Sequence, residues 1–359
     1  MNTSDVLAKM GLDAPLPMIA ERTLYGLWFQ MMAPVTDWPD EEMAKQDIAQ
    51  LNMQSALGIP GTERLTLEVI EGYVRKLDDW AEQVRRFTEK HQNKFTRRPW
   101  EYNNSRGQFS ILCLATYINK HLGMHYNKAF SQGEYDASDS RNLLLHGLLS
   151  GHGGTCATLP ILYIAIGRRL GYPLRLVHAK MHSFVRWDGP SGERFNIEAT
   201  SPGFNPRPDS HYREWPEPIS DEEFEKGAFL RSLGPREELA HALCQRTMGM
   251  IAHLKLGDAL LSCFLAARLA PDVPGVQGNW SVATVMAHAL ETARKQTGLK
   301  NYDGIDLRRI PIAEPKPPML PSVAEHVRDD LCRIARNREK ARAAAPCYSG
   351  RSQFARIRI

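Results

Sequence analysis

The strongest constraint on the fold is a helix-like segment followed by three short strand-like segments. The apolar helical run extends from Ala157 to about Leu170, and the strand-like stretches are residues 174–178, 182–187 and 194–199. Asp188-Gly-Pro-Ser-Gly192, between the second and third stretch, has the composition of a hairpin turn. Because consecutive strands joined by short loops run antiparallel, the sequence predicts an α+β fold with a helix packed on a small antiparallel sheet.

Helical patterns precede this segment. Between Thr66 and about Phe95 apolar residues recur at intervals of three and four, which predicts a long amphipathic helix. Further helices are expected over residues 108–122 and 142–150. The N-terminal flank is therefore predicted to be mainly helical.

The chain after the predicted sheet is also expected to be helical. Ser220-Asp-Glu-Glu223 is typical of a capping box, and Pro235 suits the first position of a helix. Within residues 242–271, small residues and a proline occupy tetratricopeptide-like positions, namely Ala259, Ala266 and Pro271. This pattern predicts one tetratricopeptide-like helical hairpin.

These patterns divide the chain into four predicted regions. They are a helical N-terminal region (1–104), an α+β core (105–219), a helical region with the tetratricopeptide-like hairpin (220–300), and a Pro-rich linker with a basic tail (301–359). The tail from 327 to 359 has nine Lys or Arg against three Asp or Glu, so the rest of the chain carries a net charge of −2. We interpret the tail as a solvated terminus; the alternative is a contact with nucleic acid or anionic lipid.

The composition is that of a soluble globular protein, with 43% apolar and 24% charged residues. No run of 18 apolar residues occurs, so no membrane-spanning helix is predicted. The first residues lack the basic and apolar pattern of a secretory signal. Six cysteines are scattered without a C-x-x-C pair, which favours reduced thiols. A cytoplasmic location is therefore expected.

Cys156 has the surroundings that a nucleophilic cysteine needs. A cysteine attacks an acyl group as its thiolate, so it requires a setting that favours negative charge and an open approach. Cys156 follows Gly153-Gly154, where the backbone can pass close to a substrate. It also opens the predicted apolar helix, whose N-terminal N–H groups favour negative charge and can hold an oxyanion. Cys156 is thus the predicted nucleophile.

A base and an acid follow on the predicted hairpin. His182 begins a strand whose alternation directs His182, Phe184 and Arg186 to one face. Sixteen residues later Glu198 lies on the next strand, and strand pairing brings the two side chains together. There a carboxylate would fix the imidazole tautomer and stabilise the imidazolium.

Together these motifs resemble the transglutaminase-like superfamily. The resemblance covers about residues 105–205 and is carried by Gly-Thr-Cys156 before an apolar helix, Arg-Arg-Leu-Gly-Tyr-Pro-Leu-Arg-Leu-Val before a strand, His182-Ser-Phe-Val, and Ile-Glu198-Ala-Thr. It implies a papain-like fold, a Cys-His-acid triad and thiol chemistry on amides. The upstream helices are similar to those of a bacterial branch that also carries tetratricopeptide-like helices. The family's acid is usually Asp, so Glu198 is a departure.

Two more residues are candidates for the site. His152 lies four residues before Cys156 and could contact the oxyanion or the substrate, or be an ordinary loop residue. Asn196 shares a strand face with Glu198 and could orient the imidazole in its place. No cofactor or metal is predicted, because His121 and His125, four apart on an expected helix, lack a third ligand and no phosphate-binding glycine motif occurs.

The sequence thus predicts cysteine-dependent acyl transfer on amide bonds. The reaction is either protease- or amidase-like hydrolysis or transglutaminase-type transfer to an amine, and hydrolysis is favoured because water is always present. The alternative is a catalytically inactive transglutaminase-like protein that serves as a binding scaffold. A protein or peptide substrate is expected, with a further protein partner on the helical region. Nucleic acid is not an expected partner.

Overall fold

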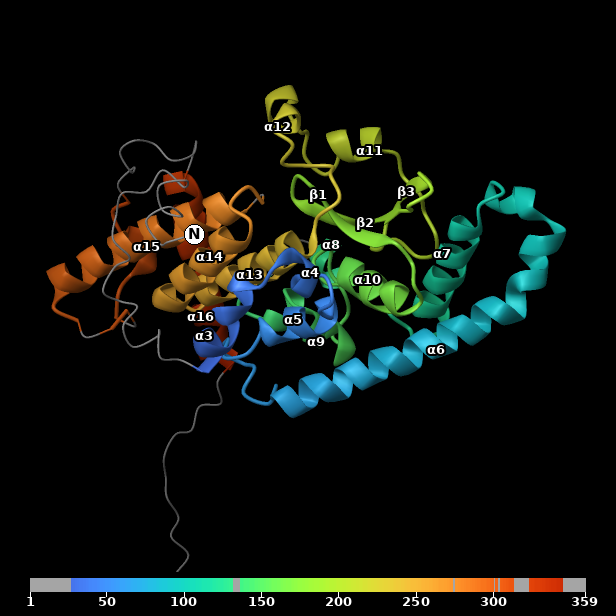
Figure 1. Ribbon diagram of the computed structural model, residues 1–359. Helices are drawn as coiled ribbons and strands as arrows, with labels where there is room; N and C mark the ends of the chain where they lie inside the picture. Colours follow the sequence, from blue (N-terminus) through green and yellow to red (C-terminus); the bar gives the residue numbers. More distant parts are fainter. Residues whose placement is uncertain are drawn as a thin grey trace, which may run out of the picture. The chain divides into compact units, whose positions relative to one another are not determined.

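The computed structural model describes residues 27–131, 136–273, 275–299, 301–302, 304–312 and 323–344 (Figure 1). They belong to two compact units, one ending at Thr284 and the other beginning at Val285. The predicted basic tail beyond residue 344 and residues 313–321 of the predicted linker lie outside the described residues. Within the described ranges, no helix combines the length and the apolar character needed to cross a bilayer.

A three-stranded antiparallel sheet, in the order β1-β2-β3, is the centre of the first unit. Its strands are β1 (Leu174–Ala179), β2 (His182–Asp188) and β3 (Arg194–Ile197). Ala179 pairs with His182 across the first turn, and Val185 pairs with Ile197 across the second hairpin. The predicted α+β class and the antiparallel sheet are confirmed.

The two faces of the sheet are covered by different parts of the chain. Val185 and Ile197 face the large core cluster that includes helix α10 (Leu159–Arg169). Phe184, one position along β2, faces the opposite way and packs with Tyr212 in a smaller cluster. The period-two alternation of a strand therefore separates two apolar layers.

The second layer comes from the segment that follows β3. It carries the short helices α11 (Asp209–Glu214) and α12 (Asp221–Glu225), which Figure 1 shows on the far side of the sheet from α10. The capping box predicted at the start of α12 is present, with Ser220 and Glu223 exchanging hydrogen bonds.

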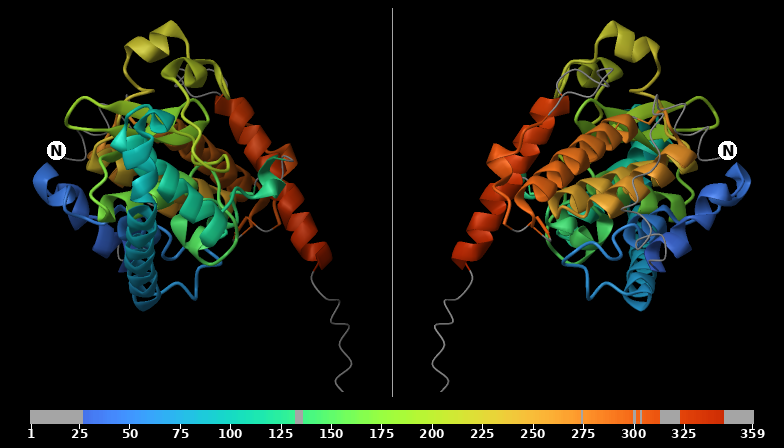
Figure 2. Two further views of the ribbon diagram at one scale, coloured as in Figure 1. Left: turned by 90° about the vertical axis from the view of Figure 1, so that its right-hand side faces the viewer. Right: turned by 90° about the vertical axis from the view of Figure 1, so that its left-hand side faces the viewer.

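Helices before the sheet build the rest of the core. They are α3 (Leu27–Met32), α4 (Asp40–Met43), α5 (Ile48–Gln54), α6 (Leu67–Arg97), α7 (Arg106–Thr116), α8 (Lys128–Ser131) and α9 (Leu145–Leu149). The Thr66 hydroxyl caps α6 by accepting from the Val69 N–H. In Figure 2, α6 and α7 lie side by side, as their contacts require. The helix expected over 142–150 is instead a 3₁₀ turn followed by the short α9.

An antiparallel helical hairpin follows, made of α13 (Pro235–Ala252) and α14 (Leu256–Leu269). Pro235 occupies the predicted helix start. The two helices lie together in both figures and form the most extensive helix pair of the described chain. A helical hairpin thus occurs at the predicted place. Its similarity to a tetratricopeptide repeat stays a prediction.

Helix α15 (Val276–Thr297) starts in the first unit and continues in the second. The second unit also holds the 3₁₀ turn η6 (Leu307–Arg309) and helix α16 (Val323–Ala344). Arg308 of η6 donates two hydrogen bonds, of 2.7 and 2.8 Å, to Glu339 of α16. This forked ion pair ties η6 to α16.

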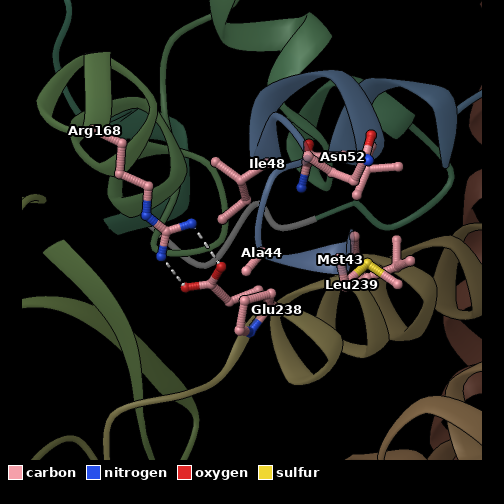
Figure 3. Close-up of a pocket in the computed structure, with 11 residues that line it drawn as sticks. Met43, Ala44, Ile48, Asn52, Arg168, Glu238 and Leu239 are labelled. Carbon is pink, nitrogen blue, oxygen red and sulfur yellow. Dashed lines mark hydrogen bonds and ion pairs between the residues drawn. The ribbon is translucent and has the colours of Figure 1, made fainter. Parts of the chain in front are cut away.

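A buried ion pair fixes α10 against α13. Arg168 donates to both carboxylate oxygens of Glu238 at 2.9 and 2.6 Å and also donates to the Leu174 carbonyl of β1 (Figure 3). The Glu238 side chain is only 2% exposed, so this pairing is needed to offset its desolvation. The adjacent cavity, lined by Ile48 and Asn52 of α5, is about 20 Å³, room for one water. These contacts hold the C-terminal end of α10 against α13 and β1.

Candidate active site

Cys156 lies in a turn that precedes α10, three residues before the first helical residue, Leu159. The expectation that Cys156 opens the helix is wrong, because the Thr155 carbonyl already accepts from Thr158 and Leu159 and so closes a separate turn. The Thr155 hydroxyl accepts from the Ala157 N–H at 3.1 Å. The Cys156 N–H has no acceptor among the residues described, so it is available to an oxyanion beside the partly exposed thiol.

The glycines before Cys156 let the loop pack closely against neighbouring segments of the chain. Gly154 donates to the His125 carbonyl at 2.9 Å and accepts from the Asn127 N–H at 2.8 Å, which forms a parallel bridge with the 125–127 segment. A Cβ on Gly154 would lie 2.4 Å from Leu159 Cγ, so only glycine fits. Gly153 has φ +90°, a conformation that glycine adopts readily. These glycines therefore have a packing role. Their expected role, close approach of the backbone to a substrate, stays a prediction.

The His182 imidazole stands between a thiol and a carboxylate. Its Nε2 is 2.9 Å from Glu198 Oε2, and the Cys156 thiol is near enough to the ring to contribute to the raised pKa of His182. Since Nε2 is occupied by Glu198, Nδ1 is the nitrogen left for the sulfur. His182 and Glu198 are buried, whereas Cys156 is partly exposed. The structure therefore brings together the three residues selected from the sequence.

Glu198 is held by four hydrogen bonds. Oε1 accepts from the Thr200 N–H at 2.9 Å and from the Thr200 hydroxyl at 2.6 Å. Oε2 accepts from the Tyr212 hydroxyl at 3.0 Å in addition to His182. Glu198 follows the last residue of β3, so continuing the β2–β3 register places it opposite Phe184, two residues from His182. The longer Glu side chain spans this offset.

Charge at the site is stabilised by mutual contacts. Burial disfavours a charged His182 ring, but hydrogen bonding and charge from Cys156 and Glu198 outweigh it and raise the pKa of His182 to about 9. Burial likewise opposes ionisation of Glu198, yet His182 and Thr200 lower the pKa of its carboxyl. The ring is thus suited to hold a proton at neutral pH beside an ionised carboxylate.

Three aromatic residues surround the imidazole and thiol. The Trp215 ring centroid is 4.7 Å from that of His182 in an edge-on contact, and Tyr212 is parallel to His182 at 6.1 Å. The pKa of Tyr126 is raised by burial and then by the charges of Cys156 and Glu198. Sequence reasoning missed all three. All three lie outside the strands and the Cys156 loop, so no local sequence pattern indicated that they belong to the site.

Asn196 does not orient the imidazole. Its Oδ1 accepts from Arg186 at 2.7 Å, and its Nδ2 donates to Asp209 at 2.7 Å and to the Arg207 carbonyl at 2.9 Å. With both amide protons engaged, Asn196 serves a buried network between the sheet and α11. Glu198, not Asn196, contacts His182.

His152 contacts the 139–142 turn. Its Nε2 lies 2.8 Å from Asn142 Oδ1 and 3.8 Å from Asp139 Oδ2. These contacts hold the loop that carries Cys156 against the 139–142 turn. The oxyanion or substrate contact considered for His152 stays a prediction.

The two histidines considered as metal ligands do not form the expected helical pair. The π-helical turn 117–121 ends at His121, so His125 does not share a helix with it. No group of three or more potential metal ligands occurs within the described ranges. A cavity of about 340 Å³, larger than the one in Figure 3, lies at the start of α13, lined by Asp40 and Arg236. Neither of these two cavities includes Cys156.

Comparison with known proteins agrees with the fold. Residues 71–215 match the family model of the transglutaminase-like superfamily, a span that includes Cys156, His182 and Glu198. No curated protein and no solved structure matches the chain significantly. The match begins within α6, upstream of the predicted core boundary at residue 105. Residues 71–215 of this chain therefore form a domain of the transglutaminase-like superfamily.

Proposed function

We propose that this protein catalyses cysteine-dependent acyl transfer on amide bonds. Cys156 is the nucleophile, His182 the general base and acid, and Glu198 the residue that orients and charges the imidazole. The observation that carries the proposal is the buried His182 ring, which contacts Glu198 through Nε2 and has its pKa raised by both Glu198 and Cys156. This is the relation of nucleophile, base and orienting acid that defines a triad.

The first half-reaction forms a thioester. His182 takes the thiol proton, and the sulfur attacks the amide carbonyl carbon, so that a C–S bond forms and the carbonyl oxygen becomes an oxyanion. The Cys156 N–H, which has no acceptor among the residues described, is available to stabilise that oxyanion. The tetrahedral intermediate collapses as the C–N bond breaks and His182 donates its proton to the departing amine.

The second half-reaction releases the acyl group. His182 takes a proton from water or from an amine, a C–O or C–N bond forms at the thioester carbon, and the C–S bond breaks. The proton returns to the thiolate. Water gives hydrolysis and an amine gives transfer; we favour hydrolysis because water is always present at the partly exposed sulfur.

Thiol labelling tests the proposal. The protein is treated with iodoacetamide at pH 6 to 7 and each modified cysteine is mapped by mass spectrometry. Cys156 is expected to react first, because the neighbouring His182 can take the thiol proton as the sulfur attacks. Cys332, also partly exposed, is an internal reference, whereas Cys113 is buried. Uniform slow labelling that His182→Ala leaves unaltered would indicate the alternative, an inactive binding scaffold.

Product analysis then separates the two reactions. Glutamine-containing peptides are incubated with the protein in the presence and absence of hydroxylamine. Ammonia without hydroxamate indicates hydrolysis, and hydroxamate indicates transfer to an amine. Neither product is expected from Cys156→Ser.

A further inference from the structure

We propose that the surface formed by Met181, Glu214, Trp215 and Glu217, named here the Trp215 surface, binds a basic and apolar stretch of the protein substrate beside the reacting amide. This inference rests on the proposed function, because it concerns how a substrate reaches Cys156. It names a substrate class: polypeptides in which Lys or Arg alternates with a large apolar residue near the acyl group.

The Trp215 surface adjoins the reacting groups. Trp215 contacts the His182 ring at 4.7 Å between centroids and is still 42% exposed. Met181 directly precedes His182 and is 74% exposed. Since the His182 side chain itself is only 5% exposed, a polypeptide that approaches the sulfur on this side meets Met181 and Trp215 first.

Met181 is presented to solvent at a conformational cost. It lies in the two-residue turn between β1 and β2 with φ 61°, in the left-handed region that glycine or asparagine occupies more easily. Its neighbour Lys180 is held by Glu223 of α12 at 2.9 Å. The Met181 side chain gains almost no burial within the protein, so intramolecular packing does not account for a strained apolar residue here. Binding of an apolar group from outside does.

The charge on the Trp215 surface is negative and uncompensated. Glu214 and Glu217 are both exposed, flank Trp215, and form no ion pair with any described residue. Nearby acids differ, since Asp221 pairs with Arg213 and Glu222 pairs with Lys226. Two exposed carboxylates close in sequence to an exposed indole favour a cationic side chain next to an apolar one.

The expected preference is moderate. An exposed ion pair contributes about 0.2–1 kcal/mol, so two such pairs give roughly a two- to thirtyfold difference in rate between a doubly basic and a neutral peptide. Screening shortens the range of exposed charges to about 3 Å at 1 M salt, so the preference should diminish there.

Three synthetic probes test the inference on the full-length protein: chloroacetyl-Arg-Phe-Arg-amide, chloroacetyl-Glu-Phe-Glu-amide and chloroacetyl-Arg-Gly-Arg-amide. The rate constant for alkylation of Cys156 by each is divided by the rate constant for iodoacetamide with the same variant. We expect the Arg-Phe-Arg probe to react about tenfold faster than the Glu-Phe-Glu probe in low salt, and about threefold faster than the Arg-Gly-Arg probe.

Matched variants assign the preference to the Trp215 surface. Glu214→Gln/Glu217→Gln should bring the normalised rates for the two charged probes close together, whereas Glu68→Gln/Glu89→Gln on α6 makes the same charge change and should preserve the difference. Met181→Asn, which suits φ 61°, should reduce the advantage of Phe over Gly. Equal normalised rates for all three probes at a reactive Cys156 would overturn this inference alone. A Cys156 that iodoacetamide does not label selectively would instead overturn the proposed function.

Discussion

The Tyr212 hydroxyl donates a 3.0 Å hydrogen bond to Glu198 Oε2, the oxygen that also contacts His182. Tyr212 is completely buried, and its ring stacks on Phe184 with centroids 3.8 Å apart. Glu198 is therefore positioned from two sides, by its own strand end through Thr200 and by α11 through Tyr212. A carboxylate placed in this way can hold one imidazole orientation despite its flexible side chain.

Tyr212→Phe should move the acid limb of the Cys156 alkylation profile to higher pH. The variant keeps the stacked ring but removes one donor from the ionised carboxylate, so the pKa of Glu198 rises. We also expect the free energy of unfolding to fall by about 1–3 kcal/mol. Iodoacetamide labelling between pH 4 and 8 measures the limb, and Tyr73→Phe on α6 is the matched control. An acid limb at its original pH would show that Tyr212 only packs.

Thr200→Val should weaken the site through the other carboxylate oxygen. It removes the 2.6 Å hydroxyl bond to Oε1 and leaves the backbone N–H bond in place. We expect alkylation of Cys156 at pH 7 to slow by about tenfold, since a hydrogen bond to a charged group contributes about 1.5–3 kcal/mol. Thr200→Ser restores the hydroxyl and should restore most of the rate. If Thr200→Ser does not restore the alkylation rate, the loss in Thr200→Val comes from altered packing and not from the missing hydrogen bond.

Asn196→Ala should reduce stability without changing the reactivity profile. Asn196 satisfies Arg186 and Asp209, not His182, so its removal leaves a buried guanidinium with one partner fewer. We expect the free energy of unfolding to fall by about 1–3 kcal/mol in denaturant titrations. The pH profile of Cys156 labelling should keep its shape, whereas Glu198→Gln should alter it. A profile altered in Asn196→Ala would return this residue to the catalytic set.

Stability should fall below pH 6.5. Burial lowers the pKa of His146 and of His241 to about 4, below the value of 6.5 in the unfolded chain. The neutral rings therefore stabilise the fold above pH 6.5, and this contribution, on the order of 3 kcal/mol each, is lost as the pH falls toward 4. Thermal unfolding at intervals between pH 4.5 and 7 measures the decline, and His241→Phe should make it shallower.

His182 has the opposite dependence on the alkaline side. Its pKa of about 9 in the folded protein lies above the unfolded value, so the charged ring stabilises the fold fully below pH 6.5. That contribution is lost as the pH rises through 9. His182→Gln should therefore flatten the fall in unfolding temperature between pH 7 and 9.5. An equally steep fall in the variant would contradict the raised pKa.

Gly154→Ala should disturb the loop that carries Cys156. The new Cβ would lie 2.4 Å from Leu159 Cγ, so α10 or the loop must move, at about 1–3 kcal/mol of folding free energy. Labelling of Cys156 should slow with it, because the thiol loses its position relative to His182. Gly72→Ala on α6, where the nearest atom is a flexible Arg75 nitrogen at 3.9 Å, is the control and should have little effect.

Much of the fold could be predicted because its signals are local. The β2–β3 hairpin follows from alternating side chains around Asp188-Gly-Pro-Ser-Gly192, and α6 follows from its apolar periodicity and the Thr66 cap. The start of α10 was misplaced because Thr155 and Thr158 form a side-chain-bonded turn of their own. Such a turn resembles a helix start in composition, and only its hydrogen bonds distinguish the two.

By itself the sequence determined the order of thiol, imidazole and carboxylate and the strands that carry the last two, because side-chain alternation and turn chemistry act over a few residues. Only the tertiary structure decided that the Tyr212 hydroxyl donates to Glu198 and that Asn196 accepts from Arg186. It also decided that the Trp215 ring contacts the imidazole of His182. These contacts join the sheet to a Pro-rich segment with no periodicity of its own. Which side chains meet there depends on how that segment packs across the sheet face, and this is a long-range property that no local pattern encodes.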